Sequence, residues 1–69
     1  MRYDVTKEAD VSLIVGDHLA AESHKLFEKR VFGAHEVVSP TVSKLVFFDG
    51  FDAAAPTIAE YEITVRRVK

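Results

Sequence analysis

Histidines and carboxylates are the side chains of this sequence best suited to acid–base or metal chemistry. The three histidines are His18, His24 and His35. On a helix, His18 and Glu22 would lie one turn apart, as would His24 and Glu28. A zinc site normally needs at least three protein ligands, and the chain has no cysteine and no His-Glu-x-x-His spacing. We therefore expect solvent-exposed histidines and no metal site.

Motifs for nucleophilic catalysis and for phosphate binding are incomplete. No serine lies in a Gly-x-Ser-x-Gly turn, and Gly16, Gly33 and Gly50 are too far apart to form a phosphate-binding loop. Asp49 and Asp52 flank Gly50 like a fragment of a calcium loop, but an ordinary turn accounts for this pair. We therefore expect no catalytic residue, no cofactor and no enzymatic activity.

The composition indicates one small domain, residues 1–69, with a thin core. The chain has 69 residues, of which 48% are hydrophobic, and it has no disulfide. A chain of this size buries only about 60% of its unfolded surface. Nine basic and 11 acidic residues give a net charge of −2, which speaks against a dedicated nucleic-acid-binding protein. No signal-peptide pattern or long apolar run is present, so we expect a cytoplasmic protein with no membrane contact.

Apolar residues alternate with polar ones at both ends of the chain, which is typical of strands with one buried face. Polar residues 7–10 suggest a hairpin with strands near 2–7 and 10–15, although one long bent strand would also fit. A final strand is predicted over 59–65. The side chains expected on the shared apolar face include Tyr3, Val11, Ile63 and Val65.

A helix is predicted between these ends, and its start has two interpretations. Asp17 could cap it, or Gly16 could mark a strand bulge and Ser23 could be the cap; we favour the second interpretation. Apolar residues fall at helical spacing from 26 to 32, and Gly33 suits the left-handed residue that ends a helix.

Residues 40–48 also allow two structures. Proline after serine could start a short helix at Ser39-Pro40, but the β-branched and aromatic residues favour a strand near 42–48, which we predict. Residues 49–57 are expected to form a loop. The predicted fold is α+β, a small two-layer ββαββ domain whose antiparallel sheet is covered on one face by a single helix.

Adjacent phenylalanines give the clearest indication of a binding surface. Phe47 and Phe48 must point to opposite faces of a strand, so a one-sided sheet can bury only one of them. Phe51 follows a glycine turn. Loop phenylalanines often fold back over a core, but exposed ones form contact patches or homodimer surfaces. We predict a site for a protein partner made of aromatic anchors and neighbouring charges: Phe48, Asp49, Phe51, Asp52, Arg66 and Arg67.

A basic stripe is the basis of an alternative function, nucleic-acid binding. It would combine Lys25, Lys29 and Arg30 of the predicted helix with the basic residues of the C-terminal segment, 66–69. Interleaved acidic residues would weaken such a stripe, so we rank this alternative below protein binding.

The predicted hairpin that enters a helix through Ala21-Glu22-Ser23, together with the closing strand from Tyr61 to Arg67, resembles small phage-encoded inhibitor proteins. The pattern is similar to compact anti-CRISPR proteins and to the T7-type inhibitor of bacterial RNA polymerase. The resemblance implies a non-enzymatic module that blocks a large host complex, a CRISPR effector or RNA polymerase, in the host cytoplasm. This chain has no tryptophan and a longer loop than the polymerase inhibitor, so no binding residue is transferred from that family.

Overall fold

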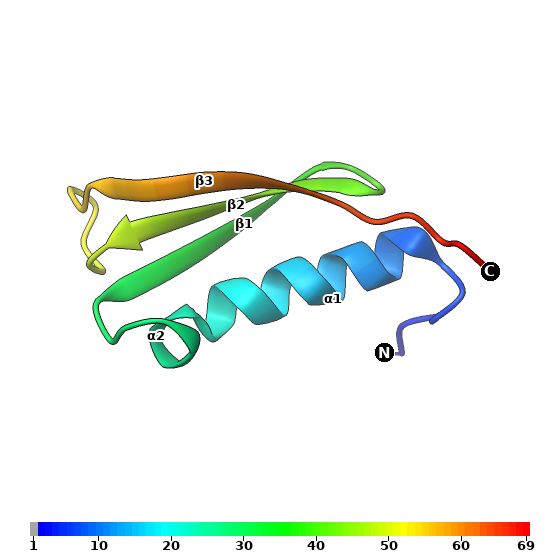
Figure 1. Ribbon diagram of the computed structural model, residues 1–69, viewed down its shortest axis with the longest axis horizontal. Coiled ribbons are helices and arrows are strands. Elements are labelled where there is room, and N and C mark those ends of the chain that lie inside the picture. The colour runs from blue at the N-terminus through cyan, green and yellow to red at the C-terminus, as the bar shows by residue number, and fades with distance from the viewer. Residues whose placement is uncertain (1) are drawn as a thin grey trace.

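The structure is a computed structural model that describes residues 2–69, and it begins with helices rather than strands. Helix α1 spans Glu8–Ala21 and the short helix α2 spans Ser23–Leu26, while strands β1, β2 and β3 span Val31–Ser39, Val42–Asp49 and Thr57–Thr64. The strands form one antiparallel sheet in the order β1-β2-β3, with α1 along one face (Figure 1). The α+β class is therefore confirmed, whereas the ββαββ order is wrong because both helices precede the sheet.

The N-terminal hairpin predicted near 2–7 and 10–15 is also wrong, because α1 occupies most of this segment. The helix turns small side chains toward the sheet: Ser12 and Gly16 are buried, and Ala20 packs against the core. These positions are four residues apart, which places them on one face of a helix. The alternation of larger apolar residues was misleading because the helix makes its contact through the small ones.

Neither predicted helix start is correct. α1 begins at Glu8, so Gly16 and Asp17 lie in its interior. Ser23 is the first residue of α2, and its hydroxyl donates a hydrogen bond of 2.7 Å to the carbonyl oxygen of Leu19. Ser23 therefore ties α2 to the last turn of α1, instead of capping a helix that continues to residue 32.

Two glycines mark the places where helix and strand approach most closely. Gly33 lies inside β1 and does not end a helix, contrary to the prediction. A Cβ atom at Gly33 would overlap the hydroxyl of Ser23 and lie 2.9 Å from the Cα of Ala20. A Cβ atom at Gly16 would overlap the imidazole of His35. Glycine at these two positions allows the helix backbone to lie directly against β1.

The strands of the C-terminal half agree with the sequence prediction. The strand predicted near 42–48 is β2, and the strand predicted over 59–65 is β3, with bounds that differ by one or two residues. In an antiparallel sheet, residues directly opposite each other point to the same face. Leu45 lies opposite His35 in β1 and Tyr61 in β3, and all three face α1.

The connections between strands are a tight turn and a longer loop. Pro40 and Thr41 form the turn from β1 to β2, so the alternative of a short helix after Ser39 is wrong. The loop predicted over 49–57 is confirmed in large part. Gly50 begins it with a φ of 123°, a conformation that favours glycine.

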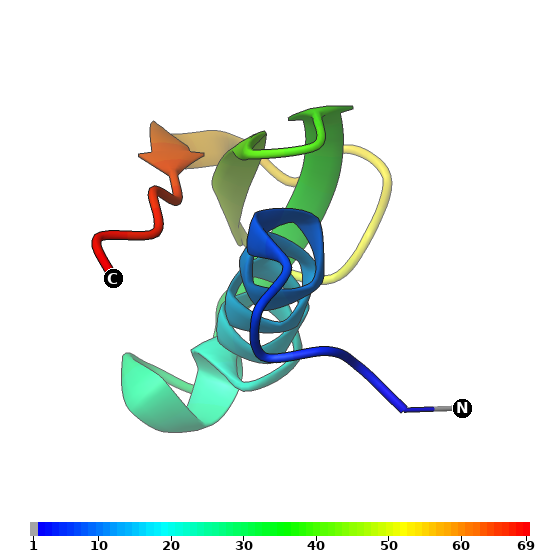
Figure 2. The same ribbon diagram turned by 90° about the vertical axis from the view of Figure 1, so that its right-hand side faces the viewer.

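The core between the layers is small. Val31, Leu45 and Phe47 are its buried apolar residues, and Leu19 and Ile63 pack against them while half exposed. α1 packs mainly on β1 and β2. Figure 2 looks along the helix and shows β3, in orange, displaced to one side of it, while β1 and β2 lie above it. The helix side of β3 is therefore largely uncovered.

The side chains expected on one shared apolar face are divided among three environments. Ile63 packs against the core, whereas Tyr3 is 49% exposed and does not belong to it. Val11 and Val65 are half-buried and line a small hollow of about 130 Å³ beside the start of α1. Within residues 2–69, no helix has the length and apolar character needed to cross a bilayer.

Candidate binding surface

Three phenylalanines form a cluster at the β1 side of the sheet, where Phe32 and Phe51 also line a hollow with Ala20 of α1 and His24 of α2. Phe32 in β1 and Phe48 in β2 are direct cross-strand partners, with ring centroids 6.2 Å apart. Phe51 approaches Phe32 from the loop, with centroids 5.7 Å apart in an edge-to-face arrangement. Phe51 is 65% exposed and Phe32 is 42% exposed. We call Phe32, Phe48 and Phe51 the aromatic cluster.

The loop after β2 holds Phe51 in this cluster through its own hydrogen bonds. The backbone N–H of Gly50 donates to the carbonyl oxygen of Arg30 at 2.8 Å, which ties the loop to the start of β1. The Asp52 carboxylate accepts a hydrogen bond of 3.0 Å from the backbone N–H of Ala54. The cluster, Asp52 and two alanines line a hollow of about 280 Å³. Asp52 therefore lies beside the aromatic side chains and also supports the turn.

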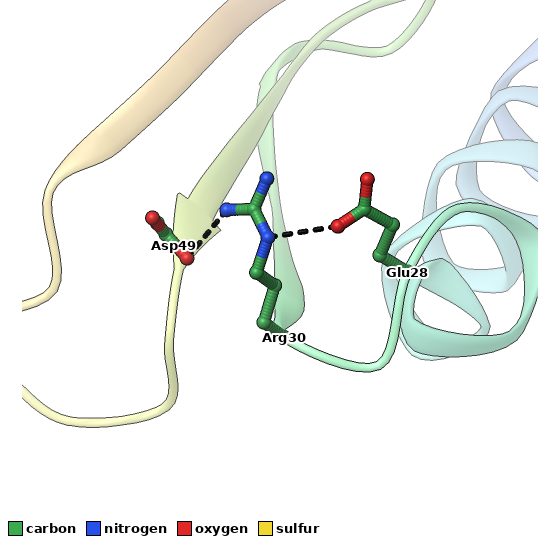
Figure 3. A network of polar contacts seen from close by, with 3 residues as sticks. All are labelled: Glu28, Arg30 and Asp49. Atoms are coloured by element: carbon green, nitrogen blue, oxygen red, sulfur yellow. Dashed lines mark hydrogen bonds and ion pairs between the residues drawn. The ribbon is translucent and has the colours of Figure 1, made fainter.

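Asp49 is engaged by a neighbouring arginine. Arg30 Nη1 lies 2.6 Å from Asp49 Oδ1, and Arg30 Nε donates to Glu28 Oε2 at 2.8 Å (Figure 3). The hydrogen bonds to Asp49 and then to Glu28 raise the pKa of the Arg30 guanidinium. All three groups are exposed, so these ion pairs should contribute little to the stability of the fold. They hold the start of β1 beside the end of β2.

The structure places Arg66 and Arg67 far from the other predicted site residues. They follow β3 near the C-terminus, whereas Phe48 and Phe51 lie at the opposite end of a molecule 39 Å long (Figure 1). Arg67 Nη1 donates to the carbonyl oxygen of Thr6 at 3.2 Å. The predicted six-residue site is thus divided into an aromatic part and a basic part.

The predicted basic stripe is divided in the same way and is wrong. Lys29 and Arg30 lie in and next to the turn before β1, at the aromatic end, while Arg66 and Arg67 lie at the other end. Lys25 is in α2 and forms an ion pair of 3.3 Å with Glu22.

A groove beside β3 was not predicted from the sequence. Its apolar walls include Phe27, Phe47 and Tyr61, its volume is about 500 Å³, and Glu28 and Arg30 lie on its lining. Phe27 and Tyr61 each pack edge-to-face on Phe47, with centroids 5.2 Å and 6.0 Å away, yet they are 57% and 58% exposed. We call this hollow the β3 groove. The alternation of residues in β3 indicated that Tyr61 points to the helix side of the sheet. It did not indicate that the helices leave Tyr61 uncovered.

His35 is buried, contrary to the expectation of exposed histidines. Its side chain is 3% exposed, and Nδ1 lies 2.8 Å from Asp17 Oδ1. A carboxylate can only accept, so Nδ1 is the donor in this hydrogen bond. Nε2 is buried against Gly16 without a hydrogen-bond partner. The pair joins α1 to β1, and among residues 2–69 no three histidine or acidic side chains are arranged as metal ligands.

No protein-family model, curated protein sequence or solved structure matches this chain. The resemblance to phage inhibitors combined an N-terminal hairpin with a closing strand. The hairpin is helix α1 in the structure, so only the closing strand of that pattern is present.

Proposed function

We propose that this chain is a non-catalytic protein-binding module that docks on a protein partner through the aromatic cluster. The observation that carries the proposal is the imbalance between core and surface. Only three apolar side chains are buried among residues 2–69, while Phe51 and Phe32 are 65% and 42% exposed and gather with Phe48 at the β1 side of the sheet. Exposed aromatic groups of this kind are typical centres of protein interfaces.

The size of the cluster fits the centre of an interface rather than a whole one. A phenylalanine buries about 150–250 Å² on association, and a standard interface buries about 800 Å² on each partner. The cluster therefore supplies the anchors, and the surrounding loop and sheet surface supply the rest. Asp52 at its rim offers a carboxylate for partner recognition, whereas Asp49 is already held by Arg30.

Occlusion of a surface on a large host complex, as phage inhibitors do, is the form of binding that we propose first. It is supported by the small size of the domain and by its preformed aromatic anchor. Nucleic-acid binding has less support, because Lys29 and Arg30 precede β1 whereas Arg66 and Arg67 follow β3, at the other end of the molecule.

Capture of a partner by matched variants tests the proposal. Phe51→Ala should weaken binding at least about thirtyfold, the loss typical of a hot-spot residue. Phe27→Ala is the control, because Phe27 is similarly exposed but lies in the β3 groove. A partner that is retained by Phe51→Ala, or lost equally with both variants, would contradict the proposal.

A further inference from the structure

β3 is an open edge of the sheet, and its charge pattern continues into the C-terminal segment. The strand pairs with β2 on one side only, and on the helix side it borders the β3 groove. The backbone N–H of Val65 donates a hydrogen bond of 3.0 Å to the carbonyl oxygen of Thr41. The pairing on the β2 side of the strand therefore continues one residue past Thr64. An edge strand offers unpaired backbone groups to another strand.

The segment from residue 57 to 69 has an acidic half followed by a basic half. Glu60 and Glu62 lie in the first half, and neither forms an ion pair with another residue of the described chain, 2–69. The second half contains three basic residues: Arg66, Arg67 and Lys69. Such a segment is complementary to itself only when two copies run antiparallel, because each acidic half then lies beside a basic half.

The antiparallel register that satisfies these charges is centred on Ile63 or Thr64. Directly opposite residues must point to the same face, so even-numbered residues pair with even-numbered ones. Centring on Ile63 places Glu60 opposite Arg66 of the second copy, and centring on Thr64 places Glu62 opposite it. A pairing centred within β3 itself, on Tyr61, would instead oppose Glu60 with the Glu62 of the second copy, which is unfavourable.

The helix side of β3 can receive the second copy as well. Odd-numbered side chains of the added segment, Val65 and Arg67, would run beside Tyr61 toward the β3 groove. Tyr61 is 58% exposed, so an arginine there meets an open aromatic ring, beside the Glu28–Arg30 pair that also lines the groove. Arg67 would give up its hydrogen bond to the Thr6 carbonyl, a surface contact of 3.2 Å.

We propose that two copies of this chain pair antiparallel along β3 and residues 65–69, and so form one continuous sheet with three strands from each copy. The proposal goes beyond binding through the aromatic cluster, which lies along β1 and the β2 end, away from this edge. Twofold symmetry makes each favourable charge contact occur twice. The pairing covers groups along β3 that are exposed in a single copy. Dimer formation therefore stabilises the folded chain, and more so at higher protein concentration.

Complementary charge reversal tests the proposal by light scattering and sedimentation of the full chain. One variant carries Glu60→Lys and Glu62→Lys, and the other carries Arg66→Glu and Arg67→Glu. Each should be monomeric alone, because all facing charges are then alike, and an equimolar mixture should form a heterodimer. The substituted side chains are exposed, and circular dichroism should show an unchanged fold. The wild-type dimer should dissociate at least about tenfold more readily in 1 M salt than in 50 mM salt.

Other outcomes of this experiment overturn the proposal. They are a wild-type monomer, variants that still form homodimers, and variants whose mixture stays monomeric. Dissociation by Phe51→Ala, with no effect of the charge reversals, would assign the dimer to the aromatic cluster instead. A wild-type monomer that binds a peptide of alternating lysine and valine would assign the β3 edge to a basic strand of another protein.

Cross-linking locates the twofold axis independently. The chain has no cysteine, so a single Thr64→Cys variant can form a disulfide only between copies. Thr57→Cys is the matched control, because it lies at the other end of β3 and is also exposed to solvent. The proposal predicts that Thr64→Cys cross-links at least about tenfold faster, because the two Thr64 residues lie opposite each other when the axis is on Thr64 and diagonally adjacent when it is on Ile63, whereas the two Thr57 residues are far apart in both registers. Equal rates would overturn the proposed register.

Discussion

The β1 side and the β3 side of the same sheet are built in different ways. Against β1, α1 presents small residues: Gly33 lets the strand approach the backbone of Ala20, and Gly16 makes room for the His35 imidazole. At β3 the contact with α1 is much smaller, and the large Tyr61 side chain faces the groove while 58% exposed. Close packing therefore stabilises one side, while the other side keeps an unpaired edge for association. Substitutions on the β1 side should therefore change mainly the stability of the fold, and substitutions on the β3 side should change mainly association.

Truncation in the centre of the core should have the largest effect. Leu45 is 3% exposed, and Leu45→Ala should lower the free energy of unfolding by about 2–5 kcal/mol. At about 0.05–0.15 kcal/mol per residue, a domain of 69 residues has about 3–10 kcal/mol of stability, so this variant should lose a large part of it. Ile58→Ala, at an exposed position of β3, should lose less than about 1 kcal/mol. Urea denaturation followed by circular dichroism measures both, and equal losses would contradict the distinction between the packed core and the exposed β3 side.

A substitution at the helix–β1 contact should have the next largest effect. Gly16→Ala would normally stabilise a helix by about 1 kcal/mol. Here the new methyl group overlaps the His35 imidazole, so we expect a loss of about 2 kcal/mol.

The double variant Gly16→Ala with His35→Ala identifies the cause of that loss. Removing the imidazole makes room for the methyl group, so the two changes together should cost at least about 1 kcal/mol less than the sum of their separate costs. Thermal denaturation of the four proteins in this cycle gives the coupling. If the losses of the two single variants simply add, the contact with the His35 imidazole is not the reason why glycine is needed at position 16.

The smallest expected effect concerns Asp4, before α1. Hydrogen bonds from the Thr6 hydroxyl and then from its backbone N–H lower the pKa of Asp4 from its ordinary value of 3.8. A carboxyl group with a lowered pKa in the folded state stabilises the fold above its unfolded pKa, and this contribution disappears as the pH falls through the folded pKa. Thr6→Val should raise the pKa of Asp4 but leave it below 3.8, because the backbone donor remains. Titration of the Asp4 carboxyl by NMR measures this change, and an unchanged pKa would contradict the role of the hydroxyl.

The sequence predicted the elements whose own residues determine them. β2 and β3 follow from β-branched, aromatic and alternating residues, and Phe47 and Phe48 do point to opposite faces, with Phe47 in the core. The helical N-terminus was missed because α1 buries Ser12 and Gly16 rather than a stripe of large apolar residues. Small residues at every fourth position, continued by Ala20, were the available signal.

Positions that depend on the tertiary arrangement could not be predicted from local patterns. Gly33 has the sequence context of a helix end, but it is needed in β1 because α1 crosses there. Phe32 joined the aromatic cluster only because it lies opposite Phe48 in the sheet, whereas helical spacing suggested a helix face. The separation of Arg66 from Phe51 likewise follows from the direction of β3 and not from any residue type nearby.

Amide hydrogen exchange at two protein concentrations tests most directly whether the β3 side is the open, associating side. The β3 amides that point away from β2 should gain at least about tenfold protection between 10 µM and 1 mM protein, while β1 amides keep the same rates. Exchange in β3 that is independent of concentration, or added protection in β1 instead, would contradict the account.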